Sequence, residues 1–171
     1  ATRSSVLIII LFCLLRPVIT TMQAAPQETY LGVLIDDSQS MSISDLDGGQ
    51  TRQAAVAESL FDDGLIDELS ESFQIRTFRF DKETQRIAGI DGLSEEGTAS
   101  SIDQALQYVD DQLNGLRLGG LVLVSDGADN GEIDPTNTAQ EFGNRQIPVF
   151  TVGVGQEDIP QDIGIVDVSA A

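Results

Sequence analysis

The chain has 171 residues, a formal net charge of -19 and no histidine. This length suffices for one domain of ordinary size with short extensions. The strong acidity argues against nucleic acid and anionic membrane surfaces as partners, since both attract cationic patches. The lack of histidine excludes a Ser-His-Asp or Cys-His nucleophile within the chain, and the single cysteine, Cys13, excludes an internal disulfide.

The chain begins with a continuously apolar run over residues 6–15, which has an arginine on each side. A full membrane span needs about 20 apolar residues, so this run suffices only if it extends beyond Arg16 or begins further upstream. A membrane anchor over 1–22, the core of a signal peptide, and a buried helix of a soluble domain all remain open. We expect the anchor, because Arg16 interrupts the usual path to a cleavage site, and residues 23–28 then form a polar linker.

The first predicted strand, residues 30–35, is an apolar run that ends abruptly at polar side chains. A run without alternation suits a strand buried on both faces of a parallel sheet. Asp36 follows at the point where ligands bind in open α/β sheets. The spacing Asp36-x-Ser38-x-Ser40 places one carboxylate and two hydroxyls on the same side of a turning loop. Such oxygen donors suit Mg²⁺, Mn²⁺ or Ca²⁺ rather than zinc.

Residues 41–49 lack the spacing and terminal glutamate of an EF-hand, so they are predicted to form a solvated turn. Apolar residues at helical spacing over 51–73 predict two consecutive helices or one helix interrupted near 62–64. Residues 74–80 alternate between apolar and polar side chains, which favours a strand nearer the edge of the sheet, and 84–90 form a weaker strand.

The second half of the chain alternates helices with buried strands. A helix is predicted over 100–113, with Ser100 and Asp103, or Ser101 and Gln104, as alternative capping boxes. Later elements are a buried strand at 121–124, a helix at 135–144 and a buried strand at 147–154. This order predicts a Rossmann-like, doubly wound α/β fold, with a mostly parallel central sheet and helices on both faces. The apolar N-terminal helix would precede it.

Two later motifs accompany the aspartate-serine motif. Thr98 stands before a predicted helix, and the pair Asp126-Gly127 follows a buried strand. These motifs in this order make the pattern of the metal-ion-dependent adhesion site of von Willebrand factor A (vWA) domains, so the chain resembles that family over residues 29–155. The resemblance implies one divalent ion, Mg²⁺ or else Mn²⁺ or Ca²⁺, held by the side chains of Asp36, Ser38, Ser40, Thr98 and Asp126. It also implies that 84–90 pairs antiparallel with 74–80.

The resemblance further implies a non-enzymatic module in which an Asp or Glu of a protein partner completes the coordination of the ion. Asp37, Asp129 and Asn130 match no ligand of the motif and are interpreted as a solvated rim. An alternative is a Mg²⁺-dependent phosphotransferase, because Asp36 at a strand end is superficially similar to haloacid-dehalogenase-type enzymes. Those enzymes need a second acid two residues on and a later lysine, for which Lys82 is the sole candidate. A further alternative is a purely structural scaffold domain, in which the ion only holds the loops together.

An apolar helix shortly before a vWA strand is also similar to bacterial membrane-anchored vWA proteins, including the aerotolerance-operon type. This resemblance implies a bacterial cell-envelope protein whose domain is periplasmic or extracytoplasmic. Residues 156–171 contain Pro160 and Gly164 and are interpreted as a linker or the start of a following β-rich module. The closing helix of many vWA domains is therefore not expected here, whereas further domains of the same polypeptide are.

Overall fold

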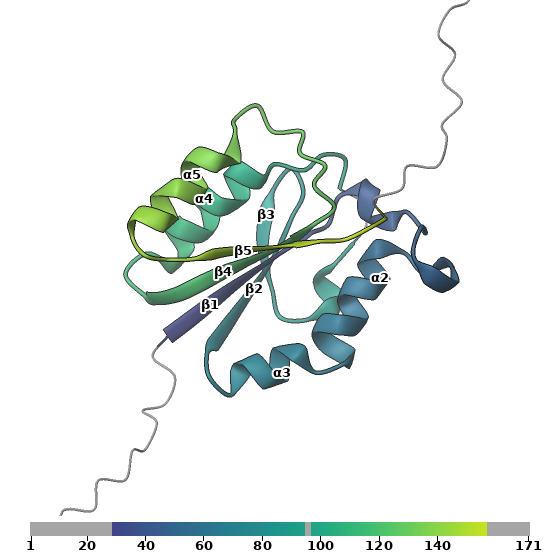
Figure 1. Cartoon of the computed structure of the whole chain (residues 1–171), viewed down its shortest axis with the longest axis horizontal. Helices are drawn as coiled ribbons and strands as arrows, with labels where there is room; N and C mark the ends of the chain where they lie inside the picture. The colour runs from purple at the N-terminus through teal and green to yellow at the C-terminus, as the bar shows by residue number, and fades with distance from the viewer. Residues whose placement is uncertain (1–28, 95–96, 157–171) are drawn as a thin grey trace, which may run out of the picture.

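The structure is a computed structural model that describes residues 29–94 and 97–156. It contains a five-stranded sheet in the order β3-β2-β1-β4-β5. The strands are β1 (Thr29–Asp36), β2 (Gln74–Phe80), β3 (Thr84–Ile87), β4 (Arg117–Ser125) and β5 (Val149–Gly153). Strands β2, β1, β4 and β5 run parallel, and β3 pairs antiparallel with β2, as expected. Figure 1 shows the sheet between two layers of helices, which confirms the α/β architecture.

Helices α4 (Ile102–Leu113) and α5 (Pro135–Asn144) cover one face of the sheet. Helix α2 (Arg52–Ala57), a π-helical turn (Glu58–Asp62) and helix α3 (Leu65–Ser70) lie on the other face. The predicted interruption separates the π-helical turn from α3, because Gly64 adopts a left-handed φ of 80°. Shorter 3-10 turns occupy Gln39–Ser42, Asp47–Gly49 and Ile90–Gly92.

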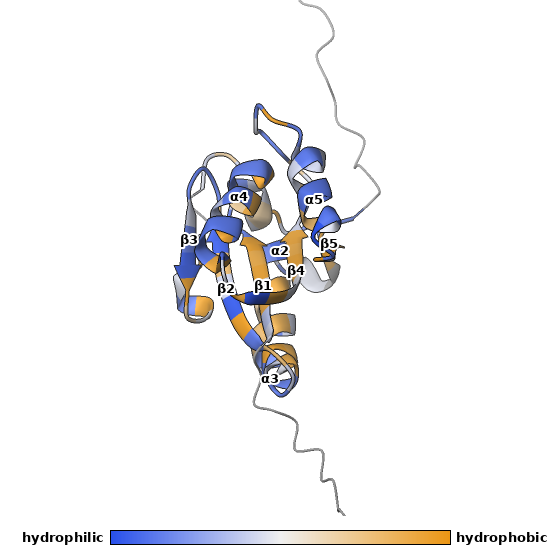
Figure 2. Ribbon diagram, turned by 90° about the vertical axis from the view of Figure 1, so that its left-hand side faces the viewer, coloured by the Kyte–Doolittle hydropathy of each residue, from blue (hydrophilic) through white to orange (hydrophobic). Residues whose placement is uncertain are grey.

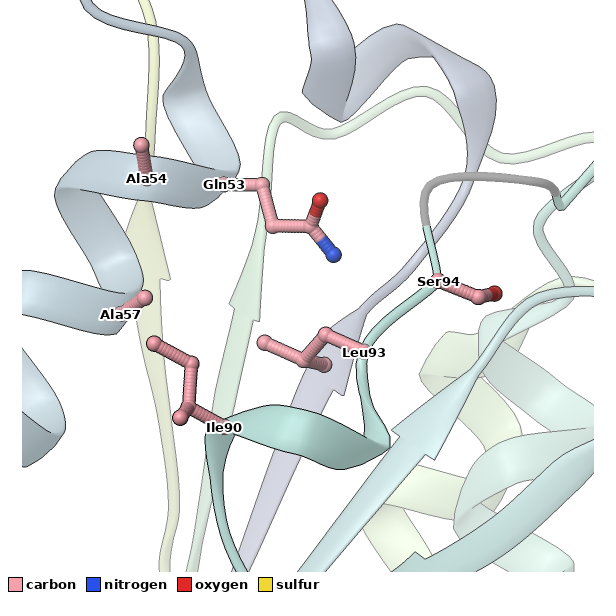
Figure 3. A pocket seen from close by; sticks show the side chains of 6 residues that line it. All are labelled: Gln53, Ala54, Ala57, Ile90, Leu93 and Ser94. Carbon is pink, nitrogen blue, oxygen red and sulfur yellow. The ribbon is translucent and has the colours of Figure 1, made fainter.

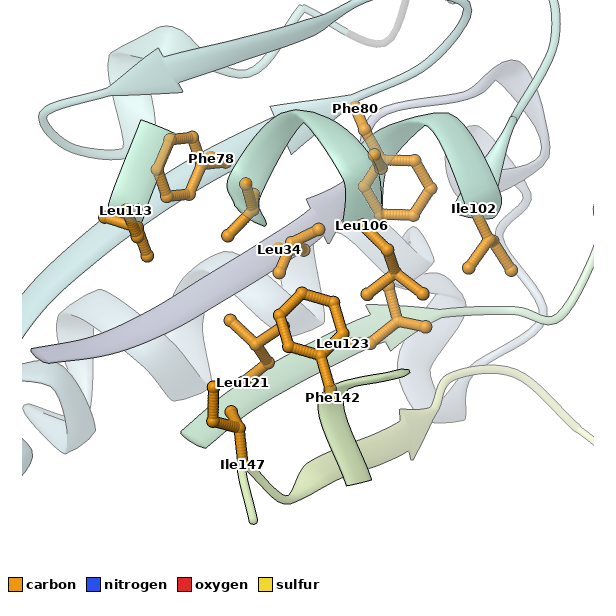
Figure 4. Packing of buried hydrophobic residues seen from close by; sticks show 12 residues of the cluster. Leu34, Phe78, Phe80, Ile102, Leu106, Leu113, Leu121, Leu123, Phe142 and Ile147 are labelled. Carbon is orange, nitrogen blue, oxygen red and sulfur yellow. The ribbon is translucent and has the colours of Figure 1, made fainter. Parts of the chain in front are cut away.

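Strand β1 lies at the centre of two apolar layers. Leu34 packs with Leu106 of α4 and Phe142 of α5 on one side, as Figure 4 shows. Val33 and Ile35 pack on the opposite side, because successive side chains of a strand point to opposite faces. Figure 2 accordingly shows β1 and β4 as largely apolar ribbons inside the molecule. This double burial fixes where β1 ends, and therefore where Asp36 is placed.

Strand β5 differs from the sequence-based expectation of a buried strand. It forms the edge of the described sheet, where Phe150 is 57% and Val152 47% exposed. An apolar cavity of about 290 Å³ opens beside it, between β4–β5 and the helices α2 and α3. An apolar run alone does not distinguish a central strand from an edge strand, because burial depends on which elements cover it.

Two predictions fall outside the described residues: the N-terminal anchor over 1–22 and the linker or further module over 156–171 beyond Gln156. Within 29–94 and 97–156, every helix is too short or too polar to span a lipid bilayer.

Candidate metal centre

Asp36 ends β1 and carries a fully buried carboxylate. Its Oδ1 accepts a hydrogen bond from the backbone N–H of Ser38 at 3.0 Å. Its Oδ2 accepts a hydrogen bond from the hydroxyl of Ser125 at 2.6 Å, and the hydroxyl oxygen of Ser100 lies 3.4 Å from it. Burial raises the pKa of Asp36 above its ordinary value, although the hydrogen bonds from Ser125 and Ser38 act in the opposite direction. A buried carboxylate that water no longer solvates would be stabilised by a bound cation.

The hydroxyls of Ser38 and Ser40 converge beside Asp36, with their Oγ atoms 3.0 Å apart. Ser38 is only 4% exposed, and Ser40 is half-buried. The 3-10 turn that begins at Gln39 presents both hydroxyls, and Met41 fixes this turn because its side chain is fully buried against the α2 side of the sheet. The prediction of a solvated turn over residues 41–49 is therefore wrong at Met41.

A second loop reaches the serines through Gly97. Ser38 and Gly97 form a parallel β-bridge, and the backbone N–H of Gln39 donates to the Gly97 carbonyl at 2.7 Å. A Cβ atom on Gly97 would lie only 2.6 Å from the carbonyl oxygen of Asp37, so glycine permits this close approach. Thr98 follows directly and is exposed at the rim of the loop. The bridge thus brings the backbone of Thr98 beside the serine turn.

Asp126 follows β4 on the third loop, and its side chain is 3% exposed. Its Oδ1 accepts a hydrogen bond from the backbone N–H of Ala128 at 3.0 Å. The charge of Asp126 contributes to the raised pKa of Asp36, although less than burial does. Two carboxylates that repel each other across a site favour a cation between them.

Arg52 is a residue at this site that the sequence reasoning missed. Its Nη1 donates to Oδ2 of Asp126 at 2.7 Å, while its Nε donates to Oδ1 of Asp45 at 3.0 Å and its Nη2 to Oδ2 of Asp45 at 2.5 Å. Asp45 is therefore an ion-paired residue and not part of a solvated turn. The sequence does hold a signal for this role. Arg52 is one of only nine basic residues, and it stands just after an acidic loop and at the start of a predicted helix.

The expectation that Asp37 belongs to a solvated rim is wrong, because its side chain is fully buried. It pairs with Arg79 of β2 at 2.6 Å, and it accepts hydrogen bonds from the Gln53 amide at 2.6 Å and the Ser94 backbone N–H at 2.9 Å. It therefore joins β1, β2, α2 and the loop before residue 95. Neighbouring side chains leave an extended chain in opposite directions, so the carboxylates of Asp36 and Asp37 lie on opposite faces of the sheet and contact different groups.

A small hollow of about 240 Å³ lies beside Asp37, between α2 and residues 90–94. Figure 3 shows the amide of Gln53 extending from α2 into this hollow toward the loop that carries Ser94. The amide oxygen Oε1 of Gln53 is buried and takes no hydrogen bond from the described part of the chain.

The start of α4 also differs from expectation. Ser101 is the N-cap but its side chain makes no capping hydrogen bond, and the Ser100 hydroxyl donates to the Ala128 carbonyl at 2.8 Å. Asp129 accepts from the backbone N–H of Ile102 at 3.3 Å, and the Asn130 N–H donates to the Ser100 carbonyl at 2.8 Å. These two residues tie the loop after β4 to α4 instead of forming a free rim.

The oxygen donors fit a hard divalent ion, because two carboxylates and several hydroxyls are available at one sheet edge. Within the described ranges, no three acidic, cysteine or histidine side chains gather into a cluster that could hold a metal. A site of two carboxylates supplemented by hydroxyls does not require such a cluster. Lys82 is exposed in the turn after β2, and no hydrogen bond or ion pair among the described residues links it to Asp36.

Three solved structures share this fold at low sequence identity. Proximal thread matrix protein 1 from the mussel byssus matches in one crystal form with a TM-score of 0.56 and 16% identity, over 74% of this chain and 38% of that chain. The same protein with a zinc-occupied metal-ion-dependent adhesion site (MIDAS) motif matches with a TM-score of 0.53 and 16% identity, over 75% of this chain and 38% of that chain. The manganese-loaded TRAP protein of Plasmodium vivax matches with a TM-score of 0.54 and 18% identity, over 77% and 58%.

The chain thus spans between 38% and 58% of the length of these solved chains. No curated protein matches it by sequence. The family model of the von Willebrand factor type A domain matches residues 31–167, which is most of the chain. The protein therefore belongs to the von Willebrand factor type A domain family.

Proposed function

We propose that this domain is a non-enzymatic module that binds a protein partner through a divalent cation. The observation that carries the proposal is the convergence of the Ser38 and Ser40 hydroxyls beside the buried carboxylate of Asp36. Two solved structures that share the fold support a bound divalent metal, since one is manganese-loaded and the other has a zinc-occupied MIDAS motif. We propose Mg²⁺ as the ion, with Mn²⁺ or Ca²⁺ as alternatives, because all the donors are hard oxygens.

The ion would be held by the side chains of Asp36, Ser38, Ser40, Thr98 and Asp126. It would supply positive charge at the carboxyl edge of the sheet, with room for one more oxygen ligand. Mg²⁺ usually keeps several waters and only one or two carboxylates from the protein. A carboxylate from an Asp or Glu of the partner can therefore replace one of those waters.

Calorimetric titration with Mn²⁺ and Mg²⁺ tests the metal site. The wild-type domain should bind one ion, and Asp36→Ala should abolish the binding heat while the protein stays folded by circular dichroism. Asp111→Ala is the matched control, because Asp111 is an exposed acid on α4. Binding by Asp36→Ala that equals that of the wild type would refute the metal proposal.

A second experiment tests whether the ion is available to an acidic partner. Bound Mn²⁺ enhances the relaxation of the water protons that exchange through its coordination shell. Acetate, as a small carboxylate probe, should reduce this enhancement, whereas uncharged acetamide should not. A purely structural ion that only holds the loops predicts no effect of acetate, together with a large loss of melting temperature in EDTA.

We further propose that the N-terminal apolar run tethers the domain to a bacterial cell envelope, with the domain outside the cytoplasm. The support is the apolar composition of residues 6–15, together with the similarity to membrane-anchored vWA proteins. Fractionation of the full chain tests this part. Recovery of an unprocessed protein in the soluble fraction would contradict it and would leave the metal proposal untouched.

A further inference from the structure

Arg52 is the one cation that touches a proposed metal ligand among the described residues. Its guanidinium lies between two acids, Asp45 on the loop after β1 and Asp126 after β4. The side chains are 15% exposed for Arg52, 20% for Asp45 and 3% for Asp126, so water screens these charges only partly. The hydrogen bonds from Arg52 lower the pKa of Asp45, and Asp45 in turn raises the pKa of Arg52.

The guanidinium is also held in place from the other side. A Cβ atom at Gly155 would lie 2.9 Å from Nε of Arg52, so the backbone after β5 passes directly against the guanidinium plane. The backbone N–H of the next residue, Gln156, donates to Asp45 at 3.4 Å. Arg52 therefore cannot rotate away from Asp126 without displacing this segment or breaking the pair with Asp45.

We propose that Arg52 is a built-in competitor of the divalent ion for the carboxylate of Asp126, and that it keeps the affinity of the site for the ion low. This inference rests on the proposed metal site. Oδ2 of Asp126 already accepts a charge-assisted hydrogen bond from Arg52, and Oδ1 accepts from the backbone of Ala128. An ion that approaches Asp126 meets a carboxylate whose charge is partly offset by Arg52, and the fixed positive charge of Arg52 repels the ion.

Asp45 has the opposite effect in this arrangement. It offsets part of the charge of Arg52 without being a candidate ligand itself. Removing the positive charge should therefore tighten ion binding, and removing the compensating negative charge should weaken it. A residue that only positioned Asp126 would give a different result, because the loss of either half of the Asp45–Arg52 pair would disturb Asp126 and weaken binding in both variants.

The test is Mn²⁺ affinity, measured by electron paramagnetic resonance of the free ion, for the full chain and two variants. Arg52→Gln retains an amide donor for Asp126 and should lower the dissociation constant about tenfold. Asp45→Asn should raise it several-fold. Arg145→Gln and Asp110→Asn are the matched controls, since they make the same charge changes in the ion pair between Arg145, directly after α5, and Asp110 of α4. They should leave the affinity unchanged.

Melting temperature in EDTA is recorded for each variant, so that a loss of stability is seen separately from a change in affinity. The inference is supported if the dissociation constant for Mn²⁺ falls in Arg52→Gln and rises in Asp45→Asn, while both controls keep the wild-type value. Weaker binding by Arg52→Gln, while the wild type binds and Asp36→Ala does not, overturns it and leaves the proposed function standing. If neither the wild type nor Arg52→Gln binds Mn²⁺, both proposals fail.

Discussion

Asp36 and Asp37 are adjacent in sequence, yet their carboxylates contact different groups. Asp36 accepts hydrogen bonds from neutral hydroxyls and has no cationic partner among the described side chains, whereas Asp37 pairs with Arg79. The alternation of side chains along β1 produces this division. The first carboxylate suits a metal ion, and the second stabilises the strands and loops around it.

We predict that Asp36→Asn stabilises the metal-free protein increasingly as pH rises. Burial raises the pKa of Asp36 above its ordinary value of 3.8, so the folded state disfavours the ionised form. That cost is absent at low pH, where the carboxyl is protonated in both states. It develops as pH rises from the unfolded pKa through the folded pKa, and it is then fully present.

Urea unfolding of both proteins in EDTA across this pH range measures the difference. The free energy of unfolding of the variant, relative to the wild type, should rise with pH and then level off. A difference that stays constant with pH would contradict the expectation.

Asp37→Ala should destabilise the domain by about 2–4 kcal/mol, because it leaves Arg79 and the Ser94 backbone N–H without their shared acceptor. Chemical denaturation in EDTA measures this loss independently of the metal. Asp111→Ala again provides an exposed acid for comparison and should change stability by less than about 0.5 kcal/mol. Equal stability of the two variants would show that the buried cluster contributes nothing.

The loops that follow β1 and β4, together with the loop before α4, owe their positions to the strands and helices that carry them. Parallel pairing of β1 with β4 aligns the ends of both strands, so Asp36 and Asp126 emerge at the same edge. Strand β1 is tightly packed at Gly32, because a Cβ atom there would be only 2.5 Å from Cδ2 of Leu121 on the neighbouring strand β4. The same atom would be within ordinary contact of Leu113 and Val109 on α4. The side chain of Leu121 can therefore take its position over β1 only because residue 32 has no Cβ atom.

Gly32→Ala should therefore cost about 1–3 kcal/mol of stability through overpacking. Gly143→Ala on α5 is the matched control, since no atom lies within 4 Å of its added Cβ. That substitution should stabilise α5 by about 0.5–1 kcal/mol, because alanine loses less backbone entropy than glycine in a helix. Thermal unfolding measures both changes. A Gly32→Ala protein as stable as the wild type would mean that the side chain of Leu121 can move aside without loss.

Apolar patterning predicted the strands well, because burial on both faces leaves a continuous run such as residues 30–35. Pro135–Asn144 was likewise predicted as a helix from its sequence. Capping of α4 was not predicted, since its acceptor, Asp129, comes from a loop 27 residues away in sequence. Arg52 was missed for the same reason, because its partner Asp126 is 74 residues away. Local patterns predict elements, whereas contacts between loops depend on the assembled sheet.

Seen as a whole, the molecule combines a net charge of -19 with a site that attracts divalent cations. Excess negative charge destabilises a compact state through self-repulsion, so any salt should stabilise the domain to some extent. A specific ion adds stability only through the folded site. The two contributions can be separated, because one depends on ionic strength and the other on Asp36.

At equal ionic strength, replacing monovalent salt by divalent ion at about 100 times its dissociation constant should add about 2.7 kcal/mol to the free energy of unfolding. EDTA should reverse the gain. In Asp36→Ala the same exchange should give only a small, non-specific increase. A gain of equal size in both proteins would show that the ions act through general screening and not through the site.

The most direct measurement is anomalous X-ray diffraction from crystals of the domain grown with Mn²⁺. One anomalous peak should appear in contact with the hydroxyls of Ser38 and Ser40, with Asp36 and Asp126 on either side of it, bound directly or through water. The absence of a peak at this place from a crystal soaked well above the measured dissociation constant, or a peak elsewhere on the acidic surface, would contradict the proposed metal centre.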